Sequence, residues 1–125
     1  MKELTKAEEQ LMQYLWTLDK AFLKDIVEQY PDPKPAYTTI STVVNVLVKK
    51  GFVGFKTFGK AREYFPKVAK SNYSKEAFNG ILKSFFDNSP SQFASFFTKE
   101  NKMSVKELEE IQAMINAEIK KQKES

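Results

Sequence analysis

The sequence predicts a mostly helical protein with one small β-hairpin. Two observations predict this fold class. Apolar residues recur at helical spacing through most of the chain, which is typical of amphipathic helices. Residues 52–58 and 62–67 read as two strands, and the Gly59-Lys60 pair between them suits a tight turn. A chain of 125 residues suits one small domain with an appended region, and we expect the boundary after residue 70.

Two helices are expected before the first proline. Residues Thr5–Glu8 form a capping-box pattern, in which the Thr hydroxyl and the Glu carboxylate each accept a backbone N–H. The apolar spacing that follows predicts a helix over about 5–18. A connector at 19–21 has room for a minimal strand, and a short helix is expected from residue 22 or 23 to residue 30. The three prolines within 31–35 end that helix.

The third helix is expected over residues 37–50. This segment is rich in β-branched residues, so a strand is a fair rival. The spacing favours a helix, because its apolar residues stand at i, i+3, i+4 and i+7: Ile40, Val43, Val44 and Leu47. Gly51 suits a left-handed helix cap. The opposite face carries small hydroxyl and amide side chains at Thr38, Thr39, Ser41, Thr42 and Asn45.

The expected hairpin follows this helix directly. It brings three basic side chains to its tip or beside it: Lys56, Lys60 and Arg62. Pro66 fits only near a strand end or on an edge. A helix with a polar face followed by a basic hairpin is the core of a winged helix-turn-helix.

Such a core predicts double-stranded DNA as the partner. The recognition helix of this motif sets its N-terminal residues against base edges in the major groove. Thr and Ser hydroxyls bind phosphates or bases, and Asn reads adenine. The hairpin lysines and Arg62 would contact phosphates or the adjacent minor groove. Tyr37 is either a further phosphate contact or a cap on the core.

The charge distribution agrees with this interpretation. The net charge of +4 lies entirely in residues 1–70, because residues 71–125 hold 8 basic and 8 acidic side chains. Residues 34–70 contain 8 basic side chains and a single acidic one, Glu63. Such a segment is the electrostatic footprint expected for phosphate binding. On charge alone, a solvated positive face is the more common explanation.

The composition argues against an enzyme. The chain has no Cys and no His, which excludes disulfides, thiolate nucleophiles, Ser-His-Asp triads and Cys/His metal sites. The neighbouring carboxylates Glu8-Glu9 and Glu109-Glu110 fit solvated helix faces. No catalytic residue, metal or cofactor is therefore expected. We find no long apolar run and no secretory signal, so a cytoplasmic protein is expected.

Residues 71–125 predict further amphipathic helices. The first is expected to start at Ser74, a short one at Pro90, and the last at the capping box Ser104–Glu107. About 50 residues are too few to bury their own apolar faces. We favour a symmetric homodimer over helices folded back on the first domain. The expected interface side chains are Phe78, Ile81, Leu82, Phe85, Leu108, Ile111 and Ile115.

These segments, taken in order, resemble the penicillinase-repressor family (the BlaI/MecI/CopY type). The resemblance covers nearly the whole chain and is strongest over residues 4–66. It rests on Leu4–Trp16, Tyr37–Thr42, Leu47–Val53, and Gly59-Lys60 with Arg62, Tyr64 and Pro66.

The resemblance implies a homodimeric winged-helix repressor that binds a palindromic operator through the positions of Thr38, Thr39, Ser41 and Thr42. Ser41 stands where the β-lactam-responsive members carry Arg. The family also implies relief of repression by cleavage in the C-terminal region, triggered by a membrane sensor metallopeptidase, without a small-molecule ligand. The related repressors are cut at an Asn-Phe bond, which aligns with Phe96-Phe97 here. The copper-responsive branch uses a Cys-rich C-terminus, which this chain lacks.

Two other classes of function remain open from the residues. One is a winged-helix module that docks a protein partner without sequence-specific DNA binding. The other is an enzyme, which would need a convergent cluster of titratable groups in a pocket.

Overall fold

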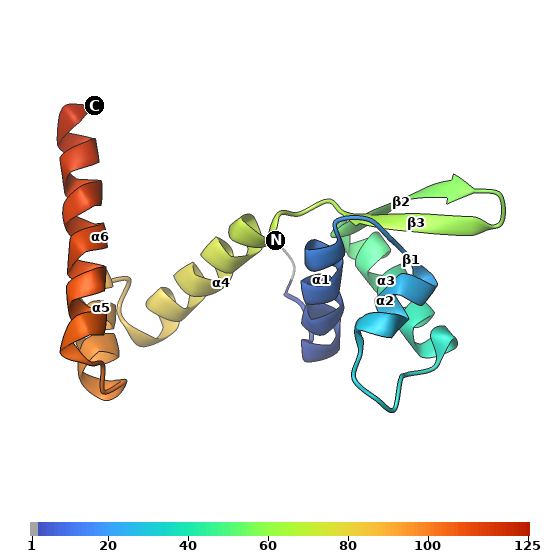
Figure 1. The fold of residues 1–125 in the computed structure, drawn as a ribbon, viewed down its shortest axis with the longest axis horizontal. Coiled ribbons are helices and arrows are strands. Elements are labelled where there is room, and N and C mark those ends of the chain that lie inside the picture. Colours follow the sequence, from blue (N-terminus) through green and yellow to red (C-terminus); the bar gives the residue numbers. More distant parts are fainter. Residues whose placement is uncertain (1–2) are drawn as a thin grey trace. The chain divides into compact units, whose positions relative to one another are not determined.

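The computed structural model describes residues 3–125 and divides the chain into two compact units (Figure 1). The first reaches as far as Ala77 and the second comprises Phe78–Ser125. The fold is mostly helical with a small three-stranded antiparallel sheet, as the sequence predicts. No helix within residues 3–125 is long and apolar enough to cross a membrane.

The first unit contains three helices and the sheet. Its elements are α1 (Lys6–Leu18), β1 (Ala21–Phe22), α2 (Leu23–Gln29), α3 (Tyr37–Lys50), β2 (Val53–Phe58) and β3 (Ala61–Pro66). The strands lie in the order β1-β3-β2. The expected minimal strand is therefore present as β1. It adds a third strand to the hairpin by pairing Ala21 with Tyr64.

The core of this unit explains why a β-branched segment forms the helix α3. Ile40, Val44 and Leu47 are buried along one face of α3. They join buried residues of α1, of α2, of one face of the sheet and of the turn before β2: Leu11, Met12, Leu15, Ala21, Ile26, Val27, Phe52, Val53 and Tyr64. Burial of these side chains at helical spacing outweighs the weak helix propensity of Val, Ile and Thr.

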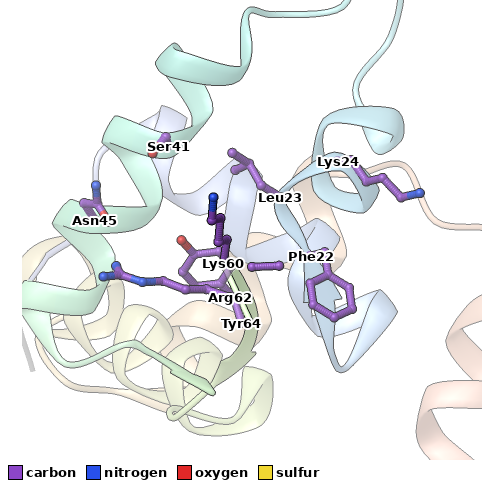
Figure 2. Close-up of a pocket in the computed structure, with 9 residues that line it drawn as sticks. Phe22, Leu23, Lys24, Ser41, Asn45, Lys60, Arg62 and Tyr64 are labelled. Carbon is purple, nitrogen blue, oxygen red and sulfur yellow. The ribbon is translucent and has the colours of Figure 1, made fainter. Parts of the chain in front are cut away.

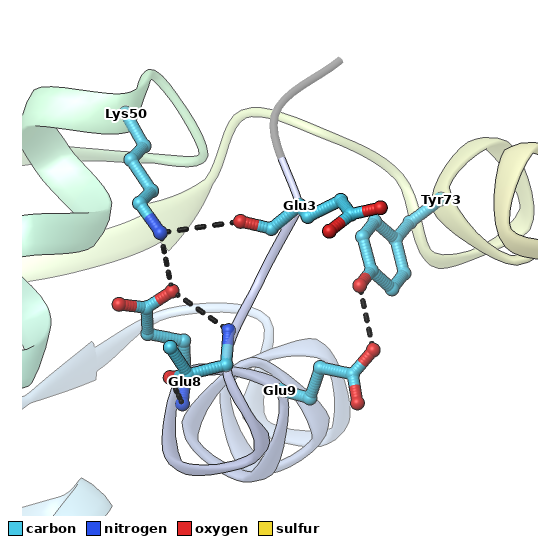
Figure 3. A network of polar contacts seen from close by, with 6 residues as sticks. Glu3, Glu8, Glu9, Lys50 and Tyr73 are labelled. Atoms are coloured by element: carbon cyan, nitrogen blue, oxygen red, sulfur yellow. Dashed lines mark hydrogen bonds and ion pairs between the residues drawn. The ribbon is translucent and has the colours of Figure 1, made fainter.

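A polar network ties the end of α3 to the start of α1 (Figure 3). The Lys50 ammonium lies 2.6 Å from Glu8 Oε1 and also donates to the carbonyl of Glu3. Glu8 closes the capping box by accepting the N–H of Thr5, while its own N–H donates to the Thr5 hydroxyl. The hydrogen bond from Lys50 is the main reason that the pKa of Glu8 lies below its ordinary value.

The helix α4 (Lys70–Phe85) begins one turn before the predicted start at Ser74, so that prediction is wrong. Packing explains the difference. The Tyr73 hydroxyl donates to Glu9 at 2.6 Å, and its ring contacts Phe52 and Trp16 at centroid distances of 5.8 and 6.0 Å. These contacts stabilise a first turn that the capping pattern at Ser74 does not indicate. The burial of Tyr73 raises its pKa to about 12, so the hydroxyl remains a donor at neutral pH.

The second unit contains the rest of α4 with α5 (Pro90–Glu100) and α6 (Val105–Glu124). Ser89 caps α5 ahead of Pro90, and Ser104 with Glu107 forms the predicted capping box of α6. A cluster of phenylalanine rings lies between α4 and α5. Phe93 lies with its ring centroid 4.8 Å from that of Phe78 and 5.6 Å from those of Phe86 and Phe97. This small aromatic cluster is not foreseen by the sequence analysis.

We predict that Lys50→Met lowers the free energy of unfolding by about 1–2 kcal/mol, because it leaves the Glu8 carboxylate without its cation in a mostly buried position. Chemical denaturation at neutral pH measures the change. Lys49→Met, at an exposed neighbouring position, is the matched control and should stay within about 0.5 kcal/mol of the wild type. Equal effects of the two substitutions would contradict a structural role for the Lys50 ion pair.

We also predict that the stabilisation by Glu8 depends on pH. The folded protein holds the pKa of Glu8 below the ordinary value of 4.5. The stabilisation is therefore present above pH 4.5 and is lost as the pH falls through the folded-state pKa. Glu8→Gln should unfold more easily than the wild type at pH 7, and the gap should shrink towards about pH 3. A gap of equal size at both pH values would contradict this account.

Candidate nucleic-acid interface

The polar face of α3 is open to solvent. Thr38, Thr39, Thr42 and Asn45 are exposed, and Ser41 is half-buried. The Thr42 hydroxyl donates to the carbonyl of Thr38 at 3.0 Å. Thr42 therefore offers a methyl group and acceptor lone pairs outward, with its proton held inside the helix. The Tyr37 side chain is 52% exposed. This exposure favours a role as a phosphate contact over a role as a cap on the core.

The start of α3 leaves backbone donors uncovered. Its N-cap residue is Ala36, and no side chain accepts a hydrogen bond from the first turn. The first N–H groups of a helix carry partial positive charge, and phosphates bind readily at such ends. The exposed side chains of Tyr37, Thr38 and Thr39 surround this end.

A cleft of about 560 Å³ lies between α3 and the hairpin (Figure 2). Ser41 and Asn45 form its α3 side, and Lys60, Arg62 and Tyr64 form its hairpin side. Phe22, Leu23, Lys24 and Ala61 complete the lining. The structure therefore brings together two of the predicted recognition-helix residues with two of the predicted wing residues.

The hairpin separates its basic residues onto two faces. Thr57 pairs with Arg62 and Lys56 pairs with Glu63 in the β2–β3 register, so Lys56 and Arg62 point to opposite sides. Arg62 stacks over the ring of Phe55 at 4.2 Å from the ring centroid. Such stacking holds the guanidinium in place while its donors remain available. Lys56 does not line the cleft, and its ammonium lies 5.7 Å from the ring centroid of Phe58 on the other face.

Two of the basic residues counted in the positive segment are engaged within the chain. Lys50 pairs with Glu8. Lys34 donates to the carbonyls of Glu28 and Tyr30 at 3.1 and 2.7 Å, where it covers the C-terminal end of α2. Six basic residues of this segment remain, and three of them lie on the hairpin: Lys56, Lys60 and Arg62.

Sequence reasoning missed two residues of this surface. Lys24 reaches the cleft from α2, and only the packing of α2 beside the hairpin reveals it. Phe55 orients Arg62. A signal for Phe55 exists in the sequence, because a two-residue turn at Gly59-Lys60 fixes the register that pairs it with Tyr64.

Five of the seven predicted interface residues of the second unit are exposed. Phe78, Ile81, Phe85, Leu108 and Ile115 are exposed, Ile111 is half-buried, and Leu82 is buried within the unit. An apolar groove of about 530 Å³ runs along α6, lined by Val105, Leu108, Ile111 and Ile115 with Thr98 of α5. Phe96 and Phe97 lie inside α5 and are also exposed.

The whole-chain comparison gives the family. The family model described as "Penicillinase repressor" matches residues 4–117. The chain belongs to the penicillinase repressor family. This confirms the resemblance seen in the sequence, and it makes the chain a member of a family of DNA-binding transcriptional repressors, not of enzymes.

Two kinds of relative support the assignment. The methicillin resistance regulatory protein MecI of Staphylococcus aureus (strain N315) is 30% identical over 119 residues, which cover 91% of this chain and 94% of MecI. MecI of Mammaliicoccus sciuri is 29% identical over the same length. The solution structure of the DNA-binding domain of the repressor BlaI aligns with a TM-score of 0.50 at 23% identity, covering 58% of this chain and 94% of that domain. The last comparison supports the fold of this family member.

Proposed function

We propose that this repressor binds a palindromic DNA operator as a homodimer in the cytoplasm. The observation that carries the proposal is the shared cleft, in which the polar face of α3 meets the cations of the hairpin. Residues 1–70 would form the DNA-binding domain and residues 71–125 the dimerisation region. Two α3 helices would enter successive major grooves about 34 Å apart.

The chemistry of each side chain suggests its role on DNA. Asn45, with one donor group and one acceptor on its amide, suits adenine in the major groove. Thr42 would meet a thymine methyl with its own methyl group. Lys60 and Arg62 would hold phosphates across the cleft from these residues. Lys56 would reach a phosphate from the opposite face of the hairpin, separately from the cleft.

The exposed apolar surface of the second unit supports a homodimer. Ten of the large hydrophobic side chains with exposed surface belong to this unit, and exposed apolar surface that gathers in one region marks an interaction site. A second copy of the same surface would cover them in a symmetric, isologous interface. The groove lined by Leu108, Ile111 and Ile115 offers space for such packing.

We also propose that cleavage within α5 relieves repression, after a signal from a membrane sensor metallopeptidase. The support is family membership together with the exposed Phe96 and Phe97 side chains. The bond between them lies inside a helix, so α5 would have to open locally before a peptidase could reach an extended backbone. No small-molecule ligand is part of this proposal.

We predict that Arg62→Ala and Asn45→Ala weaken DNA binding in different ways. Arg62→Ala should weaken binding to any duplex and reduce the slope of log K against log salt by about one, because one phosphate contact is lost. Asn45→Ala should cost about 1–3 kcal/mol on the promoter of the protein's own gene and leave the salt slope unchanged. Fluorescence anisotropy with this promoter and a scrambled duplex, over a range of salt concentrations, measures both.

Lys121→Ala, at an exposed position on α6, is the charge-matched control for Arg62 and should bind as the wild type does. An Arg62→Ala protein with wild-type affinity would remove the hairpin from the DNA interface. If the wild type binds no duplex even at low salt, the alternative of a winged-helix module for a protein partner takes the place of the repressor.

We predict that Ile111→Asp produces monomers, because a carboxylate would be buried in the apolar groove of α6. Ala117→Asp is the matched control, because by helical periodicity Ala117 lies about 120° from Ile111 around α6 and opposite the groove residue Leu108. Sedimentation velocity should give a dimer for the wild type and for Ala117→Asp. An Ile111→Asp protein that keeps its helicity and still sediments as a dimer would move the interface elsewhere.

A further inference from the structure

The tip of the hairpin presents an apolar ring to solvent. Phe58 is the last residue of β2, it is 48% exposed, and it lies outside the core of the first unit. One edge of its ring meets Phe22 at a centroid distance of 6.2 Å. Exposure of half a phenylalanine side chain is unfavourable in water, and the folded unit does not need this ring to close its core.

Basic residues lie near Phe58. The Lys56 ammonium lies 5.7 Å from the ring centroid, and Lys60 follows in the turn. Arg62 points to the opposite face of the hairpin, whereas Glu63 lies on the Phe58 face, paired with Lys56. An apolar ring beside two lysines does not suit an apolar protein partner, because the cations would lose water without gaining a counter-charge. It suits a partner whose apolar surface lies between anionic groups.

The tip is also narrow. Gly59 occupies the turn with a φ of 61°, as at the first central position of a type II′ turn, and has no side chain to widen it. The hairpin projects beyond the helices of this unit in Figure 1. The minor groove of DNA is about 6 Å wide, with sugar walls that are largely apolar and phosphates along both edges.

We propose that Phe58 is a DNA-contacting residue that inserts its ring into the minor groove beside the recognition helix. This inference rests on the proposed function and adds a contact that is not ionic. The ring would pack against deoxyribose and base edges, as apolar side chains do in minor-groove proteins. Lys60 would reach the phosphates that border the groove, and Lys56 would do so from the same face as Phe58.

The test separates an apolar contact from an ionic one by salt dependence. Phe58→Ser should bind the promoter duplex about tenfold more weakly than the wild type, as expected for half a phenylalanine ring returned to water. Its slope of log K against log salt should equal that of the wild type, because no phosphate contact is lost. Phe58→Trp, which keeps a large apolar ring, should restore most of the affinity.

Phe65→Ser is the matched control. Phe65 lies on the same hairpin face, is 36% exposed, and covers Gly54 away from the tip. It should bind DNA as the wild type does, with circular dichroism confirming that both serine variants keep their fold. Equal losses for Phe58→Ser and Phe65→Ser would indicate a weakened hairpin and overturn the inference.

Two further results would also overturn it. One is a Phe58→Ser protein with wild-type affinity. The other is a reduced salt slope for Phe58→Ser, which would mean that the ring acts by positioning Lys56. If the wild-type protein binds no duplex at any salt concentration, the proposed function itself is wrong. This result is seen in the wild-type measurement, before any variant is compared.

Discussion

The burial of one face of α3 is the interaction on which the first unit depends. The sequence of α3 is intrinsically a poor helix, because Val, Ile and Thr lose rotamer freedom against the preceding turn. Ile40, Val44 and Leu47 nevertheless lie at the spacing that places them all in the core. Their burial makes the segment helical, and the helix in turn directs Thr38, Thr42 and Asn45 outward. The candidate DNA-binding face is the geometric consequence of the core face.

The same helix is fixed at both ends by different means. Gly51 ends it in the left-handed conformation, with a φ of 84°. Lys50 joins that end to α1 through Glu8, which lies 42 positions away in the sequence. At its start, the prolines of residues 31–35 and the uncapped Ala36 leave the first turn open. The helix is thus held firmly where it meets the core and left accessible where a phosphate would bind.

Local patterns predicted the helices and strands of the first unit well, because capping boxes, apolar spacing and turn residues are local signals. The start of α4 was missed, since it depends on the docking of Tyr73 against Glu9 and Phe52. The engagement of Lys34 and Lys50 inside the fold was missed for the same reason. Charge counting along the sequence cannot distinguish a lysine that binds a carboxylate of its own chain from one that faces solvent.

The opposite orientations of Lys56 and Arg62, in contrast, could have been predicted from the sequence. A two-residue turn at Gly59-Lys60 pairs Thr57 with Arg62, and strand alternation then separates the two cations. This separation gives the hairpin an inner face towards α3 and an outer face with Phe58. The second unit offers no comparable local signal, because no turn or capping pattern in its sequence indicates which surface its exposed apolar side chains would contact.

We propose that the surface formed by α3 and the hairpin binds DNA through phosphate contacts and base readout. The most direct test is the affinity of the wild-type protein for the promoter duplex of its own gene, measured between about 50 and 200 mM salt beside a scrambled duplex. We expect a steep fall in affinity with salt for both duplexes, and tighter binding to the promoter throughout. Binding that is insensitive to salt, or equal for the two duplexes, would contradict it.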